Sequence, residues 1–143
     1  MPADRLKVRD AAEDGYEVLE NGEPIWSFET IVEAVQFVRD RDARLWLDWG
    51  RTVIGGQTVG PQDFEPSFLG SGVGRVLGEQ HGPSKDKWFW SISTNDKRWR
   101  VHGGQRGRED TKDAAVAALE REFTKYLAAT PPKPSPYAQA KGT

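Results

Sequence analysis

Basic side chains gather between residues 73 and 109, the part of the chain whose residue types are best suited to chemistry. This segment holds eight Lys or Arg against four Asp or Glu, together with three of the six tryptophans. The arginine guanidinium is a planar fork that pairs with phosphate oxygens or guanine edges, so the cluster favours a nucleic-acid partner. The candidate contacts are Arg75, Lys85, Lys87, Arg98, Arg100, Arg106 and Arg108.

Alternating residue types indicate that strands position these side chains. Successive side chains of a strand point to opposite faces of a sheet. In 88–92 the two tryptophans and the isoleucine therefore share one face, and in 97–102 Arg98 and Arg100 lie opposite Trp99. The pattern predicts a hairpin with an apolar side for the core and a basic side for solvent.

Two interpretations of this hairpin remain open. The basic face could bind a polyanion, with an exposed ring such as Phe89 stacking on unpaired bases. Alternatively, the arginines form an ordinary solvated face and the tryptophans serve only the core. In either case the alternation places Arg75, Arg98 and Arg100 away from the core, so replacing all three with alanine is expected to leave the fold intact.

The surrounding residues predict a unit of three strands and one helix over 73–129. The strands are expected at 73–80, 87–93 and 97–102, with a polar turn at 94–96. The Gly-rich segment 103–108 is expected to be a loop that carries Arg106 and Arg108. A helix capped by Asp110 or Thr111 follows, and its apolar stripe comprises Ala115, Ala118, Leu119, Phe123, Tyr126 and Leu127.

This second half resembles, over about half the chain, the AP2/integrase-type DNA-binding domain. The resemblance rests on the strand residues Gly74-Arg75-Val76, Trp88, Trp90, Ile92 and Arg98-Trp99-Arg100-Val101, and on the helix residues Thr111, Ala114, Ala115 and Ala118. It implies that the sheet enters the major groove, with Arg75, Arg98 and Arg100 as contacts and the other basic residues in flanking loops. One departure is that Gly107-Arg108-Glu109-Asp110 replaces the Gly-Thr-Phe run of the family before the helix.

Enzymatic interpretations find little support in the sequence. The two histidines, His81 and His102, lack the spacing of a metal site. The Asp110-Thr-Lys112 spacing is that of some nucleases, but no upstream carboxylate accompanies it, and helix capping explains Asp110 better. We therefore expect a binding module without catalysis, cofactor or metal.

The first half predicts an acidic hairpin-plus-helix unit over 1–54. Asn21-Gly22 between two alternating runs, 16–20 and 25–28, is a strong hairpin signal. Thr30 and Glu33 have the spacing of a capping box at the start of a helix that is expected to end between Asp40 and Asp42. The run 44–49 favours a strand, although it could prolong the helix. Residues 55–72 are rich in Gly and Pro and are expected to form a linker without regular structure.

The fold class is therefore expected to be α+β, with two hairpin-plus-helix units, of which the second is a three-stranded antiparallel sheet packed on the C-terminal helix. Residues 1–72 carry seven Lys or Arg against fourteen Asp or Glu, which leaves a protein-interaction or inhibitor role for the acidic unit as the alternative function. The absence of cysteine and of an apolar leader favours a cytoplasmic location and no membrane contact. The Pro-rich residues 130–143 are expected to be a disordered tail.

Overall fold

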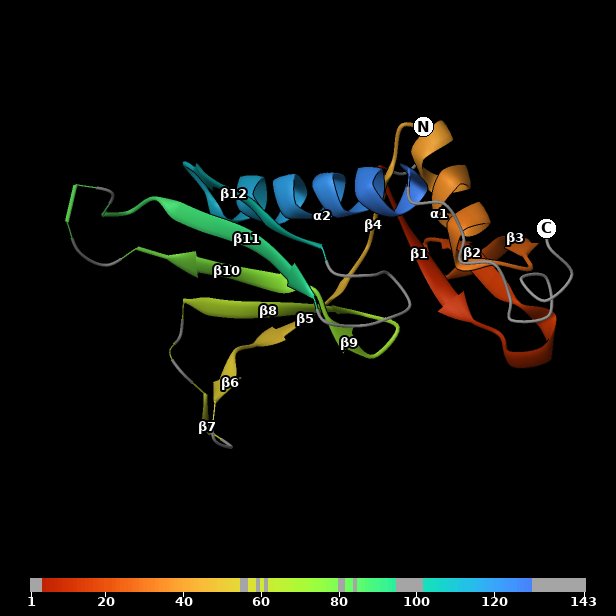
Figure 1. Ribbon diagram of the computed structural model, residues 1–143, viewed down its shortest axis with the longest axis horizontal. Helices are drawn as coiled ribbons and strands as arrows, with labels where there is room; N and C mark the ends of the chain where they lie inside the picture. Colours follow the sequence, from red (N-terminus) through yellow and green to blue (C-terminus); the bar gives the residue numbers. More distant parts are fainter. Residues whose placement is uncertain are drawn as a thin grey trace, which may run out of the picture.

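The described residues form two large, mainly antiparallel sheets, each covered by one helix, and a small two-stranded sheet of β6 and β7 (Figure 1). The computed structural model describes residues 4–54, 57–58, 60, 62–79, 82–83, 85–94 and 102–129. Its elements are β1 (Arg5–Asp10), the 3₁₀ turn η1 (Ala12–Asp14), β2 (Tyr16–Glu20), β3 (Glu23–Phe28), α1 (Ile31–Asp40), β4 (Arg44–Leu45), β5 (Asp48–Arg51), β6 (Val53–Ile54), β7 (Gln57–Thr58), β8 (Asp63–Phe68), β9 (Ser71–Gly72), β10 (Gly74–Gly78), β11 (Trp88–Thr94), β12 (His102–Glu109) and α2 (Lys112–Ala129). The α+β class and the C-terminal helix packed on strands are confirmed.

The first sheet has the strand order β3-β2-β1-β4. Asn21 and Gly22 both adopt positive φ, 53° and 84°, as the tight turn of the predicted β2–β3 hairpin requires. One half of the predicted capping box is present, since the Thr30 hydroxyl accepts a hydrogen bond from the Glu33 amide at 3.2 Å. The same hydroxyl donates to the Glu33 carboxylate at 2.9 Å. Strand β1 was not expected, although its apolar Leu6 and Val8 alternate with charged residues; it pairs antiparallel with β2 and parallel with β4.

The second sheet is wider than the three strands expected, with the order β12-β11-β10-β8-β5 and β9 paired to β8. The expectation that 55–72 has no regular structure is wrong, because β8 lies in this stretch and pairs with both β5 and β10. Pro66 is tolerated there although it lacks an amide hydrogen, and its carbonyl accepts a hydrogen bond from the Val73 amide at 3.0 Å. The run 44–49 is extended as favoured, but it divides into β4 and β5 of different sheets.

The last strand lies later in the chain than expected. Residues 97–101 of the predicted strand lie outside the described residues, whereas the predicted loop 103–108 is part of β12, so that expectation is wrong. Packing explains why residue 107 is a glycine, since a Cβ there would lie 2.8 Å from Nε1 of Trp90, its cross-strand partner. Gly107 therefore makes room for a ring that the sheet needs in its core.

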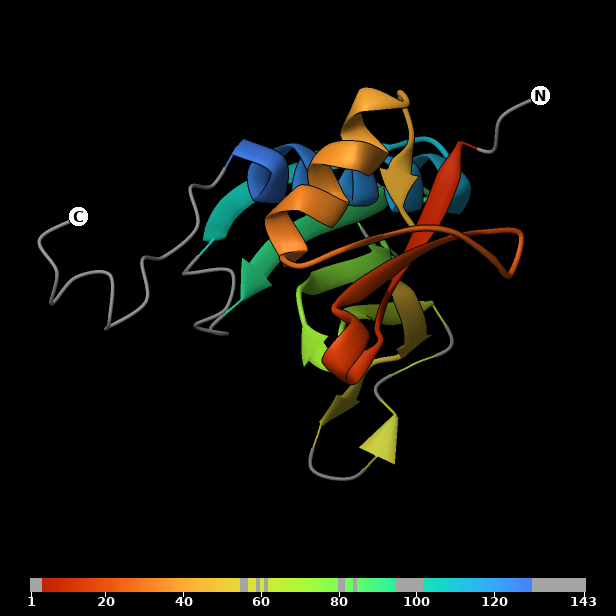
Figure 2. The ribbon, with the colours of Figure 1, turned by 90° about the vertical axis from the view of Figure 1, so that its right-hand side faces the viewer.

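Helix α2 covers one face of the second sheet and ends beside α1 (Figures 1 and 2). The Thr111 hydroxyl caps it by accepting a hydrogen bond from the Ala114 amide at 3.1 Å. Its buried stripe includes Leu119, Phe123 and Leu127, as predicted, and these belong to one hydrophobic cluster with Leu6, Val35, Leu45, Val76, Trp90 and Ile92. The predicted acidic and basic units thus share a core.

A buried carboxylate on α2 joins the two halves. Glu120 is fully buried and accepts hydrogen bonds from Arg5 Nε and Nη2 (2.9 and 2.7 Å) and from Arg44 Nε (2.9 Å). The Leu47 amide and Trp49 Nε1 donate two more, at 3.0 and 2.9 Å. Residues of β1, β4 and β5, together with Leu47 between β4 and β5, therefore donate five hydrogen bonds to the carboxylate of this one residue of α2.

Within the described part of the chain, neither helix is long and apolar enough to cross a membrane.

Candidate nucleic-acid interface

The sheet face turned away from α2 carries several of the predicted contacts. Cross-strand partners share a face, and the register places Arg75, Ser91 and Arg106 in one row across β10, β11 and β12. The opposite face holds Trp90 and Ile92, which are buried against α2 as the alternation predicted. We call the sheet face that carries Arg75 and Arg106 the open face.

The neighbouring row of the open face places Leu77 and the Phe89 ring between two charged residues, Asp63 and Arg108. Leu77 lies opposite Phe89, and Phe89 lies opposite Arg108. The Arg108 guanidinium carbon is 5.4 Å from the centroid of the Phe89 ring, a cation–π geometry. Phe89, Arg106, Gly107 and Arg108 line a hollow of about 490 Å³. The structure therefore brings Arg106 and Arg108, expected in a loop, onto the same strand face as an accessible ring.

Arg75 is tied to a carboxylate that the sequence did not reveal. Its Nε donates to Asp63 Oδ1 at 2.8 Å and its Nη2 to Asp63 Oδ2, while the Thr52 hydroxyl donates to Asp63 Oδ1 at 2.6 Å. The hydrogen bond from Arg75 holds the pKa of Asp63 below its usual range although burial opposes this, and the same bond raises the pKa of Arg75. Replacing Arg75 with alanine would leave the buried Asp63 without its cation, so the expectation that this leaves the fold intact is corrected.

Two more predicted contacts are also paired within the chain. Arg108 Nε donates to Glu79 Oε1 at 2.8 Å. Lys87 pairs with Asp110, and this mutual hydrogen bond raises the pKa of Lys87 and lowers that of Asp110. Both of these pairs include an exposed basic side chain, so a phosphate could replace the carboxylate at modest cost.

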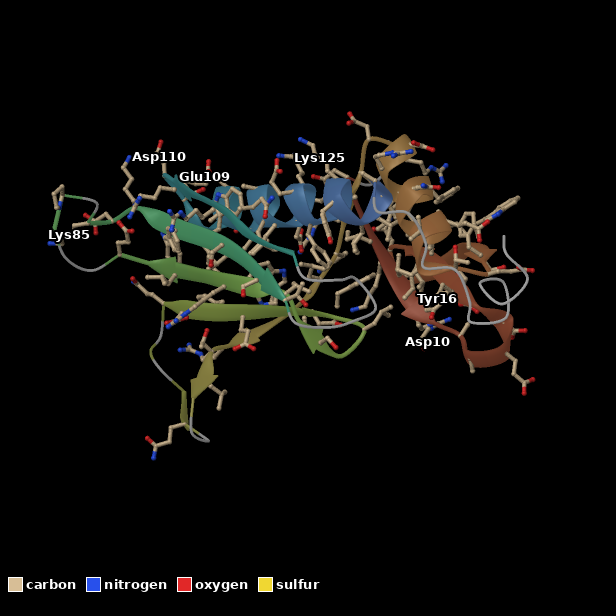
Figure 3. All side chains as sticks on the ribbon, viewed as in Figure 1. Asp10, Tyr16, Lys85, Glu109, Asp110 and Lys125 are labelled. Carbon is tan, nitrogen blue, oxygen red and sulfur yellow. The ribbon has the colours of Figure 1, made fainter. Side chains whose placement is uncertain are left out.

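Arg106 and Lys85 are exposed and form no ion pair with any residue that the structure describes. Figure 3 places Lys85 at the end of the molecule where Glu109 and Asp110 also lie. Among the candidate contacts that the structure describes, these two side chains have no described carboxylate to compete with an anionic ligand. Arg98 and Arg100 lie outside the described residues.

The described residues offer little to a metal or a catalytic mechanism. No group of three or more Asp, Glu or His side chains among them could hold a metal ion. His81 lies outside the described residues. Lys112 of the Asp110-Thr-Lys112 spacing has its amine 3.8 Å from the centroid of the Phe64 ring, where it packs against the sheet face that α2 covers.

Neither protein-family models, nor curated proteins, nor solved structures gave a match to this chain. The resemblance to the AP2/integrase-type domain therefore stays a prediction.

No pattern in the sequence indicated that Asp63 and Glu79 are the carboxylates that hold Arg75 and Arg108. They lie 12 and 29 residues from their partners, and only the register of β8, β10 and β12 brings them close. Phe89 was a candidate because it stands in the alternating run on the face opposite Trp88 and Trp90.

Proposed function

We propose that this protein is a non-catalytic binding module that takes nucleic acid on its open face. The observation that carries the proposal is the group formed by Phe89, Arg106 and Arg108 around one hollow on an exposed sheet surface. A ring offers every base a stacking surface, and arginines beside it can hold the phosphates on either side.

The pairing pattern assigns different roles to the basic residues. Arg106 and Lys85 contact phosphates first because no described carboxylate competes for them. Arg108 and Lys87 contribute by exchanging their carboxylate partners for phosphate. Arg75 serves to hold Asp63 and the adjoining strands rather than to bind.

The test is a fluorescence anisotropy titration of the full chain with labelled oligonucleotides of about 20 nucleotides, single-stranded and duplex. Phe89→Leu keeps the apolar volume but removes the ring, and it should weaken single-strand binding roughly 5- to 150-fold, since a base stacked on an aromatic side chain contributes about 1–3 kcal/mol. Arg106→Gln should flatten the slope of log K against log salt by about 0.7 for a single strand or 0.9 for a duplex.

Arg121→Gln is the matched control, because Arg121 is exposed on α2 and forms no ion pair with the described residues. It should leave affinity and salt slope almost unchanged. If the parent protein binds neither form at low ionic strength, the proposal fails. If Arg106→Gln and Arg121→Gln behave alike, binding occurs away from the open face and the site is wrong.

A further inference from the structure

Trp26 is the most exposed of the large hydrophobic side chains in the described part of the chain, at 62%. It lies on β3, the edge strand of the first sheet, and it does not belong to the hydrophobic cluster. Single exposed apolar side chains are ordinary on protein surfaces. Trp26, however, lines a hollow of about 410 Å³ together with Glu17, Pro24 and Ser27.

The edge next to this hollow is poorly suited to accept another strand. Pro24 has no amide hydrogen to donate to a neighbouring strand, and the register between β2 and β3 shifts between Val18 and Leu19. Both features discourage edge-to-edge pairing. A partner at this place must therefore engage the hollow with side chains rather than extend the sheet.

The charges around the hollow select the chemistry of that partner. Residues 10–38 contain eight Asp or Glu and no Lys or Arg. Six of the acids are exposed and form no ion pair with a described residue: Asp10, Glu13, Asp14, Glu23, Glu29 and Glu33. Figure 3 shows Asp10 and Tyr16 of this acidic end far from Lys85, at opposite ends of the molecule. Phosphates would be repelled here, whereas a basic segment would be attracted.

Elsewhere in the chain, one arginine contacts both an aromatic ring and a carboxylate. The Arg5 guanidinium carbon lies 4.4 Å from the centroid of the Trp46 ring, and Arg5 Nη2 donates to the carboxylate of Glu120 at 2.7 Å. Trp26 and Glu17 offer the same combination of ring and carboxylate at the surface. Glu17 holds Arg9 with one oxygen, Oε2, and this leaves Oε1 for a second cation.

We propose that Trp26 and Glu17 form a docking site for a lysine- or arginine-rich segment of a partner protein, with one cation over the indole ring and its charge facing Glu17. The exposed acids of residues 10–33 attract the remaining basic residues of the segment. The site is independent of the open face and of its proposed ligand.

The test uses the full chain and a fluorescein-labelled peptide of alternating Arg and Gly, about ten residues long, in an anisotropy titration. Trp26→Ala should weaken binding roughly 2- to 30-fold, the range expected for a cation–π contact between its exposed and its desolvated limits. Trp26→Phe should retain part of the affinity because a phenyl ring still attracts a cation. Glu17→Gln should weaken binding, whereas Glu122→Gln, a control on α2 whose carboxylate lies 3.5 Å from Lys125, should not.

A substitution at a side chain that is 62% exposed should not change the thermal midpoint, which a melt would verify. Equal affinity of Trp26→Ala and the parent would overturn the proposal, because any binding would then be a diffuse attraction to the acids. Absence of binding by the parent would overturn it as well. Binding that emerges only after removal of residues 130–143 would assign the hollow to the chain's own segment with Lys133 and Lys141 and would also overturn it. Oligonucleotide binding by Trp26→Ala should equal that of the parent, which separates this test from that of the open face.

Discussion

Replacing Glu120 with glutamine should remove a large part of the stability of the protein. The substitution preserves shape but deletes the charge that Arg5 and Arg44 surround, and it turns one acceptor oxygen into a donor group that faces other donors. Glu120 is fully buried, and the side chains of Arg5 and Arg44 are only 23% and 11% exposed, so water cannot replace the lost bonds.

The magnitude follows from the number and kind of these bonds. Hydrogen bonds to a charged group contribute about 1.5–3 kcal/mol each, but five such values are not additive within one network. Removing one partner of a buried ion pair costs about 3–5 kcal/mol, which we take as the expected loss for Glu120→Gln. Domains of ordinary size are stable by about 5–15 kcal/mol, so the expected loss lies between about a fifth and the whole of such a stability.

Urea unfolding followed by tryptophan fluorescence measures this loss. With a slope of about 1–3 kcal/mol per molar urea, the midpoint should fall by more than about 1 M while the slope stays constant. Glu122→Gln is the control, because this neighbour lies on the same helix and faces a partly exposed Lys125. Its effect should stay within about 0.5 kcal/mol. A loss below about 1 kcal/mol for Glu120→Gln would refute the view that this carboxylate holds the two halves together.

Two further predictions concern the core and the pH dependence of stability. Phe123 is fully buried, with its ring edge-on to Phe68 at a centroid distance of 5.7 Å, so Phe123→Ala should cost about 3–5 kcal/mol in the free energy of unfolding measured with urea. A loss below about 1 kcal/mol would show that the cavity collapses. Asp63 has a lowered pKa because Arg75 and Thr52 hold its charged form, so its contribution to stability is present above the unfolded pKa near 4 and is lost as the pH falls through the folded value. The stability difference between the parent and Asp63→Asn should therefore shrink between pH 6 and pH 2, and a difference that stays constant over this range would contradict the proposed cause.

The parts of the fold that were predicted correctly are those specified by neighbouring residues. The β2–β3 hairpin needed only Asn21-Gly22 to set its turn, and the start of α1 needed only Thr30 and Glu33. The face assignment of β11 followed from a period of two in a run of large apolar residues. In each case the information lies within a few positions of the element that it specifies.

The parts that were missed depend on residues far apart in the sequence. Gly107 is a poor strand residue by propensity, and only the indole of Trp90 explains why a glycine is required in β12. Glu120 follows Leu119 on a helix and would normally be read as solvated, because Arg5 is 115 residues away. For the candidate site, the basic residues of 75–108 were found from composition, but the carboxylates that pair with Arg75, Lys87 and Arg108 were not.

The order of Arg5, Arg44 and Glu120 along the chain has a consequence for synthesis on the ribosome, because Glu120 follows its two arginines by 115 and 76 residues. Arg5 and Arg44 leave the exit tunnel long before α2 is made, and until then the nascent first sheet lacks both the carboxylate and the apolar stripe that cover it. The strands of this sheet and α1 can form local structure, but their apolar side chains are fully covered only after α2 has been synthesised. The first sheet should therefore reach its native packing only after α2 has been synthesised, and a stalled chain that ends before α2 should be bound by chaperones or degraded.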